Sequence, residues 1–575
     1  MKHIRQDNTH NIARNSTGRE KILLGLLPYW TPMIPALGIA SLKSFLQKYG
    51  YTVKTVDATV EEEFKEIYNQ YFDLLKANVP KVKRGNFYNV GNDVLQNHMM
   101  AHMNRRDQEE YIELVKKIIY SVYYTHIDRQ VILELGRILG EFFARLENYF
   151  LNILENEKPD VVGLTIHNHT LPASLFAFKL TKERYPHIRT VMGGGIFSES
   201  LAIGSPNLDY FVEKTPFIDK IIIGEGENLF LKLLRGELPG SKKVVTLDDI
   251  QRRTIDINTA DIPDLTDFNL DKYPCQGISC SRSCPYQCAF CSDPVYFGKY
   301  RVRNVKQSAS EMVELYKGHN NQLFHMTDSL LNPIITEISN ELIKSGVSLY
   351  WDGYLRIGER LCNIENTILW RRGGFYRVRL GVESGSQRVL DMMDKKITVE
   401  QIKASIYSIA YAGIKTTTYW VVGFPGETEA DFQQTLDLLE ELKDDIWEAW
   451  CHPFQYCLSG LVKSDKWREH AVRLYPQKAK ELLLLETWIV DCEPNREKIY
   501  RRLNRFVEHC DRLGIPNPHF MNEVFKADER WKRLHKNAVP AMVEFNDKIY
   551  IDENRHVKLV SRSQKKEEDD SDFVF

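Results

Sequence analysis

Three cysteines near the middle of the chain have the spacing of a metal-binding loop. Cys284, Cys288 and Cys291 are separated by three and then two residues, within the segment Gly277–Tyr300. Cysteine thiolates are the usual protein ligands of iron–sulfur clusters. Three thiolates can bind three irons of one [4Fe-4S] cubane, which leaves the fourth iron without a protein ligand. An open coordination position distinguishes a reactive metal centre from a closed structural one.

This motif resembles the signature of the radical S-adenosylmethionine (radical SAM) superfamily. That signature is CxxxCxxC with an aromatic residue before the last cysteine, and Phe290 occupies this position. The resemblance implies that SAM binds the open iron and is split into methionine and a 5′-deoxyadenosyl radical. It also implies an electron donor such as flavodoxin or ferredoxin. The alternatives for the cysteine loop are a zinc site or a chance cluster.

Length and composition limit the other possibilities. A chain of 575 residues is too long for one hydrophobic core and predicts three or four domains. The net charge of −2 favours neither nucleic acid nor an anionic membrane as a partner. All ten cysteines occur at or after Cys275, which argues for a reducing compartment. The uncharged segment Ile22–Leu42 could span a bilayer, but prolines interrupt it, so we expect a cytoplasmic protein.

Two α/β domains are predicted to position the cysteine loop. In the first, apolar runs such as Lys21–Leu27 and Val161–Ile166 alternate with amphipathic segments such as Ala36–Tyr49. This alternation indicates a doubly wound, Rossmann-like parallel sheet, which binds ligands at the carboxyl ends of its strands. Residues 60–150 interrupt the domain with apolar residues at helical spacing. We expect this helical insertion to cover the active site or to receive a substrate.

Glycines follow two apolar runs of the first domain, at Gly193–Gly195 and Gly224–Glu227. With PALGIASLKSFLQKYGYTVKTVDA and PDVVGLTIHNHT, these segments resemble the cobalamin-binding domain that precedes many radical SAM domains. The Asp-x-His-x-x-Gly element, by which some cobalamin proteins ligate cobalt, is absent, so we expect no such histidine ligand. The resemblance implies cobalamin contacts from Thr165, His167, Gly193, Gly194, Gly195, Gly224 and Glu225.

The histidines of the first domain leave alternatives open. His167 and His169 could face the corrin ring of cobalamin, or they could be ordinary polar loop residues. The domain could also have lost its cofactor. In the insertion, His98 and His102 are interleaved with methionines, which is compatible with a soft-metal site or with a packed helix face.

Strands and helices alternate again after the cysteine loop. The predicted strands are Gln322–Thr327, Ser348–Tyr354, Tyr376–Val382, Lys415–Val422 and Trp447–Gln455. With one strand before the loop, they match the partial (β/α)6 barrel that the radical SAM resemblance implies. Full barrels of this type carry their chemistry at the carboxyl ends of the strands. The resemblance implies SAM contacts from Phe290, Thr327, Asp328, Arg356, Glu383, Ser384 and Gly423.

The types of these residues suit the groups of SAM. A carboxylate such as Asp328 accepts hydrogen bonds from an ammonium, and the forked guanidinium of Arg356 matches a carboxylate. Glu383 lies in GVESGS, and Gly423 begins GFPGET, two segments similar to those of cobalamin-type radical SAM proteins. For each polar residue alone, a helix cap or a solvated turn is the alternative.

These observations predict several units along the chain. They are a disordered N-terminus (1–19), a cobalamin-binding-like domain (20–240), a linker (241–276), a radical SAM barrel (277–458), a helical C-terminal domain (459–560) and an acidic tail (561–575). Four cysteines toward the C-terminus could hold an auxiliary cluster, but they match no ligand spacing, so we expect free core residues: Cys451, Cys457, Cys492 and Cys510.

The family resemblance implies a radical SAM enzyme that, with cobalamin, methylates an unactivated carbon of a peptide or small-molecule substrate. One alternative is an enzyme with the same domains that uses the radical for cyclisation, rearrangement or oxidation. Another is a non-catalytic iron–sulfur or zinc binding module. A methylthiotransferase is disfavoured, because that family needs N-terminal cysteines and none precedes Cys275.

Overall fold

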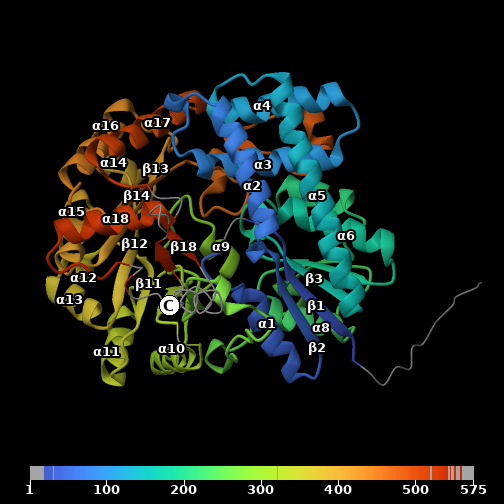
Figure 1. Cartoon of the computed structure of the whole chain (residues 1–575), viewed down its shortest axis with the longest axis horizontal. Helices are drawn as coiled ribbons and strands as arrows, with labels where there is room; N and C mark the ends of the chain where they lie inside the picture. The colour runs from blue at the N-terminus through green and yellow to red at the C-terminus, as the bar shows by residue number, and fades with distance from the viewer. Residues whose placement is uncertain are drawn as a thin grey trace, which may run out of the picture.

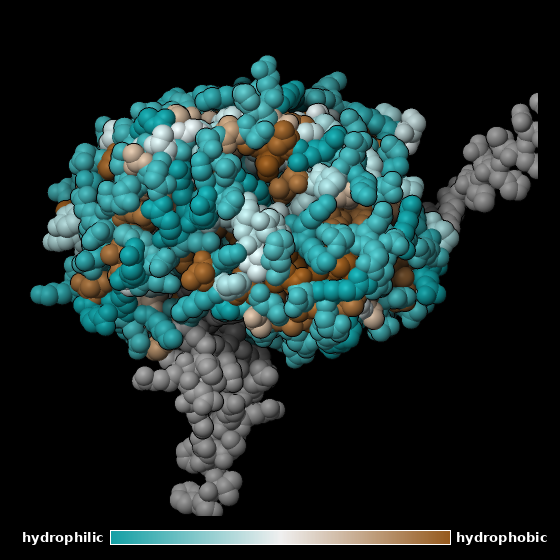
Figure 2. Space-filling view, turned by 90° about the horizontal axis from the view of Figure 1, so that it is seen from above, coloured by the Kyte–Doolittle hydropathy of each residue, from teal (hydrophilic) through white to brown (hydrophobic). Residues whose placement is uncertain are grey.

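The computed structural model describes residues 19–29, 32–319, 321–517, 521–541, 544, 549–551 and 557–559. Within them, two parallel six-stranded sheets lie side by side, each surrounded by helices (Figure 1). The face shown in Figure 2 is mainly hydrophilic, with its hydrophobic residues in separate small patches. In the described part of the chain, no helix is long and apolar enough to cross a membrane. The predictions for residues 1–18 and for the acidic tail lie outside the described residues.

The first sheet is parallel throughout and has the order β2-β1-β3-β4-β5-β6. The chain reverses its direction of winding between β1 and β3, which is where doubly wound sheets bind ligands. This sheet confirms the predicted Rossmann-like fold. Its strands are β1 (Lys21–Leu26), β2 (Thr52–Asp57), β3 (Val161–Thr165), β4 (Arg189–Gly193), β5 (Lys220–Ile223) and β6 (Val244–Thr246).

Helices cover both faces of the first sheet, and this explains why its strands are almost entirely apolar. Ile22 and Leu24 pack with residues of α1 and α8, whereas Leu23 points to the other face. On that face α5 packs against α6 (Figure 1). The helices that follow strands are α1 (Leu37–Lys48), α6 (Leu171–Arg184), α7 (Pro206–Lys214) and α8 (Gly226–Leu234).

The predicted linker contains β6, which the sequence pattern does not reveal. Val245 is fully buried in this strand, and Ile222 of β5 pairs with it. Three residues are too few to show a periodicity, so the sixth strand is missed. Farther along, the linker is held to the first domain by an ion pair, with 2.8 Å between Lys43 Nζ and Asp267 Oδ2.

The insertion is helical, as predicted, and its histidines belong to a packed helix face. The His98 ring is fully buried, and its nitrogens lie 2.9 Å from Tyr71 Oη and 2.7 Å from Tyr111 Oη. Both ring nitrogens are therefore used within the insertion, which favours the packing interpretation over a soft-metal site. The helices are α2 (Glu62–Asn78), α3 (Phe87–Asn104), α4 (Gln108–Tyr123) and α5 (Arg129–Glu157).

The second sheet is an open barrel with the order β7-β10-β11-β12-β13-β14, and it confirms the predicted (β/α)6 fold. Its strands are β7 (Gln276–Ile278), β10 (Leu323–Met326), β11 (Tyr350–Leu355), β12 (Phe375–Glu383), β13 (Lys415–Val422) and β14 (Glu448–Pro453). Its helices are α10 (Val305–His319), α11 (Ile335–Ser345), α12 (Glu359–Cys362), α13 (Ile364–Arg372), α14 (Gln387–Met392), α15 (Val399–Tyr411) and α16 (Glu429–Glu441).

A charged network inside the barrel ties three strands together. The carboxylate of Asp352 on β11 accepts hydrogen bonds from His325 Nδ1 at 2.6 Å and from Arg377 Nε and Arg379 Nε at 3.0 Å. Burial alone would raise the pKa of Asp352, but Arg379, His325 and Arg377 hold it well below its usual range. A buried charge needs this pairing, so the network fixes how β10, β11 and β12 present their ends.

The C-terminal region is only partly helical. The helices α17 (Arg496–Leu513) and α18 (Met521–Leu534) agree with the prediction. The segments before α17 do not, because β15 (Ala471–Arg473) and β16 (Trp488–Val490) form an antiparallel ribbon there. Their apolar residues are spaced as in a helix, but the pairing of the two strands overrides that local pattern.

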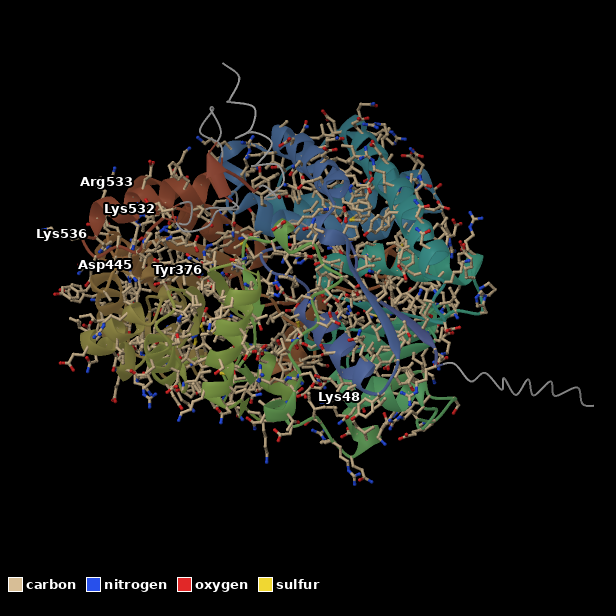
Figure 3. The ribbon with its side chains drawn as sticks, turned by 60° about the horizontal axis from the view of Figure 1, so that its bottom comes forward. Lys48, Tyr376, Asp445, Lys532, Arg533 and Lys536 are labelled. Atoms are coloured by element: carbon tan, nitrogen blue, oxygen red, sulfur yellow. The ribbon has the colours of Figure 1, made fainter. Side chains whose placement is uncertain are left out.

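The last described helix, α18, packs against the barrel. Its Asp528 forms an ion pair with Lys415 of β13, with 2.7 Å between Oδ1 and Nζ, and both side chains are buried. Exposed basic residues at the end of α18, Lys532 and Arg533, lie on the same side of the molecule as Asp445 (Figure 3). The ion pair between Asp528 and Lys415 therefore holds α18 against the barrel.

Candidate active site

The cysteine motif lies on a loop that a short ribbon closes. β8 (Ser281–Arg282) pairs with β9 (Arg301–Val302), and the loop between them contains the motif and the helix α9 (Asp293–Phe297). A turn brings the second and third cysteines together, because the Cys291 amide donates to the Cys288 carbonyl oxygen at 3.1 Å. The loop is thus anchored at both ends and tightly folded at the motif.

The three thiols lie close to one another. Burial raises the pKa of Cys284, and the neighbouring Cys288 adds to this rise. Burial and then Asp293 raise the pKa of Cys291 to about 12, and the other two thiols contribute. Among the described residues, no three His, Cys, Asp or Glu side chains are arranged around a single metal ion. A cubane does not require such convergence, because each thiolate binds a different iron, so this donor set fits a [4Fe-4S] cluster.

Arg356 reaches the same loop from the end of β11. Its Nη1 donates to Cys288 Sγ at 3.2 Å, and its guanidinium lies 4.0 Å from the centre of the Tyr286 ring. The Asn332 side chain fixes its backbone through two hydrogen bonds of 2.7 Å. Nη2 is buried and has no hydrogen-bond partner within the part of the chain that the structure describes. Nη2 is therefore a buried, charged donor without an acceptor, next to a cysteine that would bind the cluster. Such a donor could bind the carboxylate of SAM.

Glu383 and Phe290 are linked by a lysine that no motif marks. Glu383 ends β12 in the left-handed region, with φ of 67°. Its Oε1 accepts a hydrogen bond from Lys395 Nζ at 2.5 Å, and both side chains are buried. Lys395 Nζ in turn lies 5.8 Å from the centre of the Phe290 ring. Lys395 therefore joins the end of β12 to the cysteine loop.

Asp328 and Ser384 lie at strand ends as predicted, but their side chains point into the protein. Asp328 is 1% exposed, and it accepts hydrogen bonds from the Cys280 amide at 3.0 Å and from Ser281 Oγ at 2.5 Å. Ser384 is fully buried and accepts from the Ser386 amide at 3.1 Å. Both oxygens are used to hold the cysteine loop and α14. Their contact with SAM stays a prediction.

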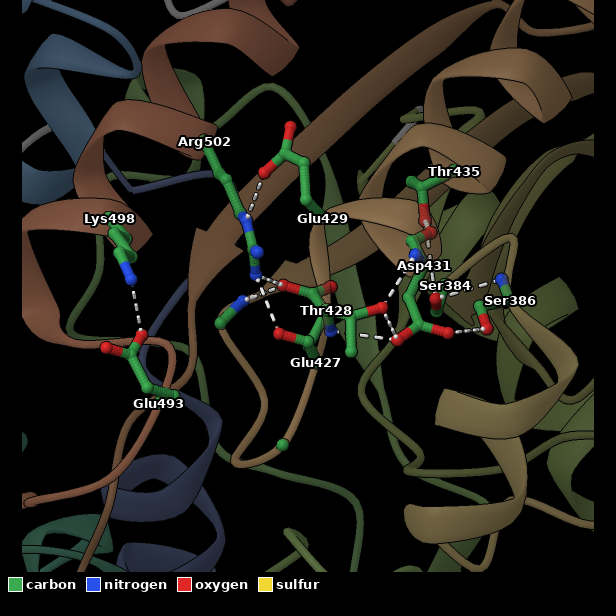
Figure 4. A network of polar contacts seen from close by, with 12 residues as sticks. Ser384, Ser386, Glu427, Thr428, Glu429, Asp431, Thr435, Glu493, Lys498 and Arg502 are labelled. Atoms are coloured by element: carbon green, nitrogen blue, oxygen red, sulfur yellow. Dashed lines mark hydrogen bonds and ion pairs between the residues drawn. The ribbon is translucent and has the colours of Figure 1, made fainter.

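The segment that begins at Gly423 forms a turn against α17 (Figure 4). The Gly423 amide donates to Glu427 Oε2 at 2.8 Å, and Arg502 Nη1 of α17 donates to the same oxygen at 2.7 Å. Burial raises the pKa of Glu427 to about 7. A Cβ at Gly423 would lie 2.3 Å from Ile499, so here the glycine allows α17 to come close. Thr428 then caps α16.

Five of the seven predicted cobalamin residues line two adjoining cavities. A narrow cavity of about 180 Å³ lies at the carboxyl ends of β3 to β5, and a larger one of about 580 Å³ lies between the first sheet and the barrel. Gly38, Leu42 and Gly226 line both. The narrow cavity contains Thr165, Gly193, Gly194 and Gly224, and the larger one contains Glu225 and Thr327.

Glycines allow the close packing of the segments that line the narrow cavity. A Cβ at Gly194 would lie 2.3 Å from the Ile166 amide nitrogen, so only glycine fits there. Gly163 has Leu24 and Phe230 packed closely against it. A glycine-lined space at the switch point of the sheet fits a narrow, flat group of a cofactor such as cobalamin. The neighbouring cavity gives room for the rest of it.

The other two predicted residues, His167 and Gly195, line neither cavity, and Glu225 and the neighbouring His169 make contacts of their own. His167 packs beside Gly195, where a Cβ would lie 2.8 Å from its Nδ1. The ring of His169 stacks on Tyr29, with 4.6 Å between ring centres, as an ordinary loop residue can. Glu225 forms ion pairs with Arg282 and Arg301 and so ties the first domain to the ribbon under the cysteine loop.

Comparison with known proteins finds a family whose model matches this part of the chain. Residues 278–439 match the model of the radical SAM superfamily, from the end of β7 through the cysteine loop and into α16. Residues 278–439 are a radical SAM domain. The three cysteines and Arg356 all lie within it.

Curated relatives have different activities. Over 322 residues the chain is 27% identical to an anaerobic magnesium-protoporphyrin IX monomethyl ester cyclase of Rubrivivax gelatinosus, covering 50% of this chain and 55% of the cyclase. Over 361 residues it is 24% identical to an uncharacterised methyltransferase of Pyrococcus horikoshii, covering 58% and 73%. The chain thus spans about half the length of the cyclase it matches.

A solved structure shares the whole architecture. The radical SAM methyltransferase TsrM of Kitasatospora setae, solved with cobalamin and a [4Fe-4S] cluster bound, superposes with a TM-score of 0.53 at 14% identity. The match covers 90% of this chain and 100% of that one. At this identity the likeness shows the fold, in which a Rossmann-like domain precedes the radical SAM domain.

Proposed function

We propose that this protein is a radical SAM enzyme that cleaves SAM and, with cobalamin, methylates an unactivated carbon of a peptide or small-molecule substrate. The observation that carries the proposal is the meeting of three thiols with the unpartnered Nη2 of Arg356 inside a radical SAM domain. A [4Fe-4S] cluster would be held by Cys284, Cys288 and Cys291. When bound, it supplies the electron that splits SAM.

The chain's own residues then bind and orient SAM. Arg356 Nη2 donates to the SAM carboxylate, because it is a buried charged donor with no other acceptor. Glu383 accepts from the SAM ammonium, with Lys395 holding the carboxylate in place. Phe290 and Thr327 contribute the remaining contacts. An electron donor such as flavodoxin or ferredoxin reduces the cluster.

Cobalamin occupies the two adjoining cavities between the domains. The support for this is the glycine lining of the narrow cavity and the shared fold with TsrM, whose structure contains cobalamin. The sequence lacks the Asp-x-His-x-x-Gly element, so the chain would supply no histidine of that type to cobalt. Bound cobalamin supplies a methyl group for transfer to carbon.

A non-methylating reaction is the second candidate, because relatives that include the Rubrivivax gelatinosus protein are cyclases. Product mass separates the two functions. Methylation adds the mass of one methylene group to the substrate, whereas cyclisation by oxidation removes hydrogen.

Anaerobic reconstitution with iron, sulfide and hydroxocobalamin tests the proposal. The parent protein should show the absorbance of both cofactors and form 5′-deoxyadenosine from SAM after reduction with dithionite. Cys288→Ala should lose the cluster absorbance and the 5′-deoxyadenosine. Cys362→Ala, at a cysteine in α12 outside the loop, should keep both. Equal SAM cleavage by the Cys288 variant and the parent would refute the proposal.

A further inference from the structure

A cavity of about 180 Å³ opens at the mouth of the barrel, where three regions of the chain meet. Its lining includes Asp93 from the insertion helix α3, Glu199 from the first domain, and Phe454 after the barrel strand β14. Trp488 of β16 and Arg496 of α17 complete it from the C-terminal region. We name this space the mouth cavity. It adjoins the strand ends where barrel enzymes react, because Gly423 and Pro425 also line it.

The mouth cavity contains a carboxylate without a partner. Across the described chain, Asp93 makes no hydrogen bond and no ion pair. Burial raises its pKa to about 6 in spite of the nearby Arg496, and the charge of Glu199 adds to the rise. Glu199 itself receives a hydrogen bond from Asn168 Nδ2, and burial raises its pKa as well. Asp93 and Glu199 thus face one small space without an ion pair, whereas the third carboxylate of the lining, Glu486, is paired with Arg473 and Lys480.

The one arginine of the lining does not neutralise them. Arg496 Nε donates to the Ser121 carbonyl oxygen at 3.0 Å, and Nη2 donates to Tyr500 Oη at 2.9 Å. With the residues that the structure describes, it forms no ion pair within 4.0 Å. Its position is therefore set by neutral groups, and its charge only partly offsets that of Asp93, whose pKa stays raised.

Two further polar atoms of the lining have no partner. Asn168 Oδ1 and Trp488 Nε1 are buried, and neither has a hydrogen-bond partner in the described structure. Buried polar atoms in native proteins are nearly always hydrogen-bonded, so such atoms need an explanation. The unsatisfied acceptor Asn168 Oδ1 and the unpaired carboxylate in one cavity indicate that a ligand with hydrogen-bond donors supplies the missing partners. Trp488 Nε1 is itself a donor, so it would need an acceptor elsewhere on that ligand.

We propose that the mouth cavity binds a protonated amine of the substrate, with Asp93 and Glu199 as its acceptors. An ammonium donates three hydrogen bonds, and Asp93, Glu199 and Asn168 Oδ1 in the lining offer three acceptors. An anionic group placed there would be repelled by the charges of Asp93 and Glu199. The small volume suits an arylalkylamine or one lysine side chain, with Phe454 and Trp488 packing against its apolar part.

This inference deepens the proposed function, but its test does not depend on SAM cleavage. Binding of phenethylamine, 2-phenylethanol and 3-phenylpropionate to the full-length protein is measured by saturation-transfer NMR. The three probes have similar size and differ in charge. An acetylated, amidated tripeptide with a central lysine is the fourth probe and shows whether the amine comes from a peptide.

The amine should bind at least ten times more tightly than the alcohol, and the carboxylate should not bind detectably. Asp93→Asn should weaken amine binding by about 10- to 100-fold, the range for a hydrogen bond to a charged group. Glu213→Gln, on the exposed surface of α7, is the matched control and should bind as the parent does.

Equal binding of the three small probes, or no detectable binding of either amine, would overturn the inference. An unchanged affinity in Asp93→Asn would also overturn it. Tighter binding of the tripeptide than of phenethylamine would support amine recognition and identify a peptide as the source. If SAM is not cleaved but amine binding depends on Asp93, the proposed reaction fails while the inference stands.

Discussion

The hydroxyl of Tyr296 donates a hydrogen bond to the carbonyl oxygen of Gly194 at 3.0 Å. Tyr296 lies in α9, directly after the cysteine motif, and Gly194 follows β4 of the first sheet. In Figure 1, α9 lies between the two sheets. This contact therefore connects the loop that would hold the cluster to the glycines that would face cobalamin.

Removing this hydroxyl should loosen the cysteine loop. Tyr296→Phe keeps the ring but leaves the Gly194 carbonyl without its donor, at a cost of about 1–3 kcal/mol. We expect faster hydrogen exchange of the amides in Asp293–Phe297. Tyr407→Phe, at an exposed residue of α15, should have no such effect. Unchanged exchange in α9 would show that the hydrogen bond does not hold the loop.

Arg356 should be sensitive even to a conservative change. In Arg356→Lys the charge remains, but the forked donors that reach both Cys288 and a carboxylate are lost. We expect SAM to bind about 10-fold more weakly, measured as the SAM dependence of 5′-deoxyadenosine formation. Arg360→Lys, four residues farther along and exposed, serves as the control. A SAM dependence equal to that of the parent would exclude Arg356 as a SAM ligand.

Filling the narrow cavity should prevent cobalamin binding without removing the cluster. A Cβ at Gly193 has no neighbour closer than 3.9 Å, so Gly193→Val is compatible with the local fold. Its larger side chain occupies space that the cofactor would need. The absorbance of bound cobalamin should fall at least 10-fold after reconstitution, whereas the cluster absorbance should not change. Gly240→Val is the control in an open loop. Full cobalamin loading of Gly193→Val would place the cofactor elsewhere.

The ion pairs of Glu225 should stabilise the junction between the two domains. The Glu225 side chain is 6% exposed, and its partners Arg282 and Arg301 are 24% and 27% exposed. Breaking a fully buried pair costs 3–5 kcal/mol, so we expect about 2 kcal/mol for Glu225→Gln in urea unfolding. Glu237→Gln removes an exposed pair with Lys232 and should cost less than 1 kcal/mol. Equal effects of the two substitutions would contradict this prediction.

Glu427 should make stability depend on pH. Burial raises its pKa from 4.5 to about 7 in the folded protein, so the folded state binds the proton more tightly than the unfolded state. The resulting stability is fully present below pH 4.5 and is lost as pH rises through 7. Glu427→Gln should therefore reduce the loss of unfolding free energy between pH 5 and pH 8 by about 1–2 kcal/mol. Urea titrations at both pH values measure this, and parallel curves for variant and parent would disprove it.

The fold and the position of the motif follow from local patterns in the chain. The spacing of the three cysteines is a local property, and a tight loop preserves it. Apolar runs that alternate with helices predict both sheets, and the bounds predicted for β13, Lys415–Val422, are those of the structure. The sequence does not predict β6, because three residues are too few to show a periodicity of apolar positions.

Only the tertiary structure decided which polar groups face the site. Asp328 is at the predicted strand end, yet its carboxylate points to the Cys280 amide, because a buried loop needs acceptors for its backbone. Lys395 contacts Glu383 and Phe290 only in the folded barrel. In the same way, Asp93 reaches the mouth cavity because the insertion folds over the barrel. The sequence shows which residue types stand at the ends of the strands. Which side chains become partners depends on packing, because the partners lie far apart in the sequence.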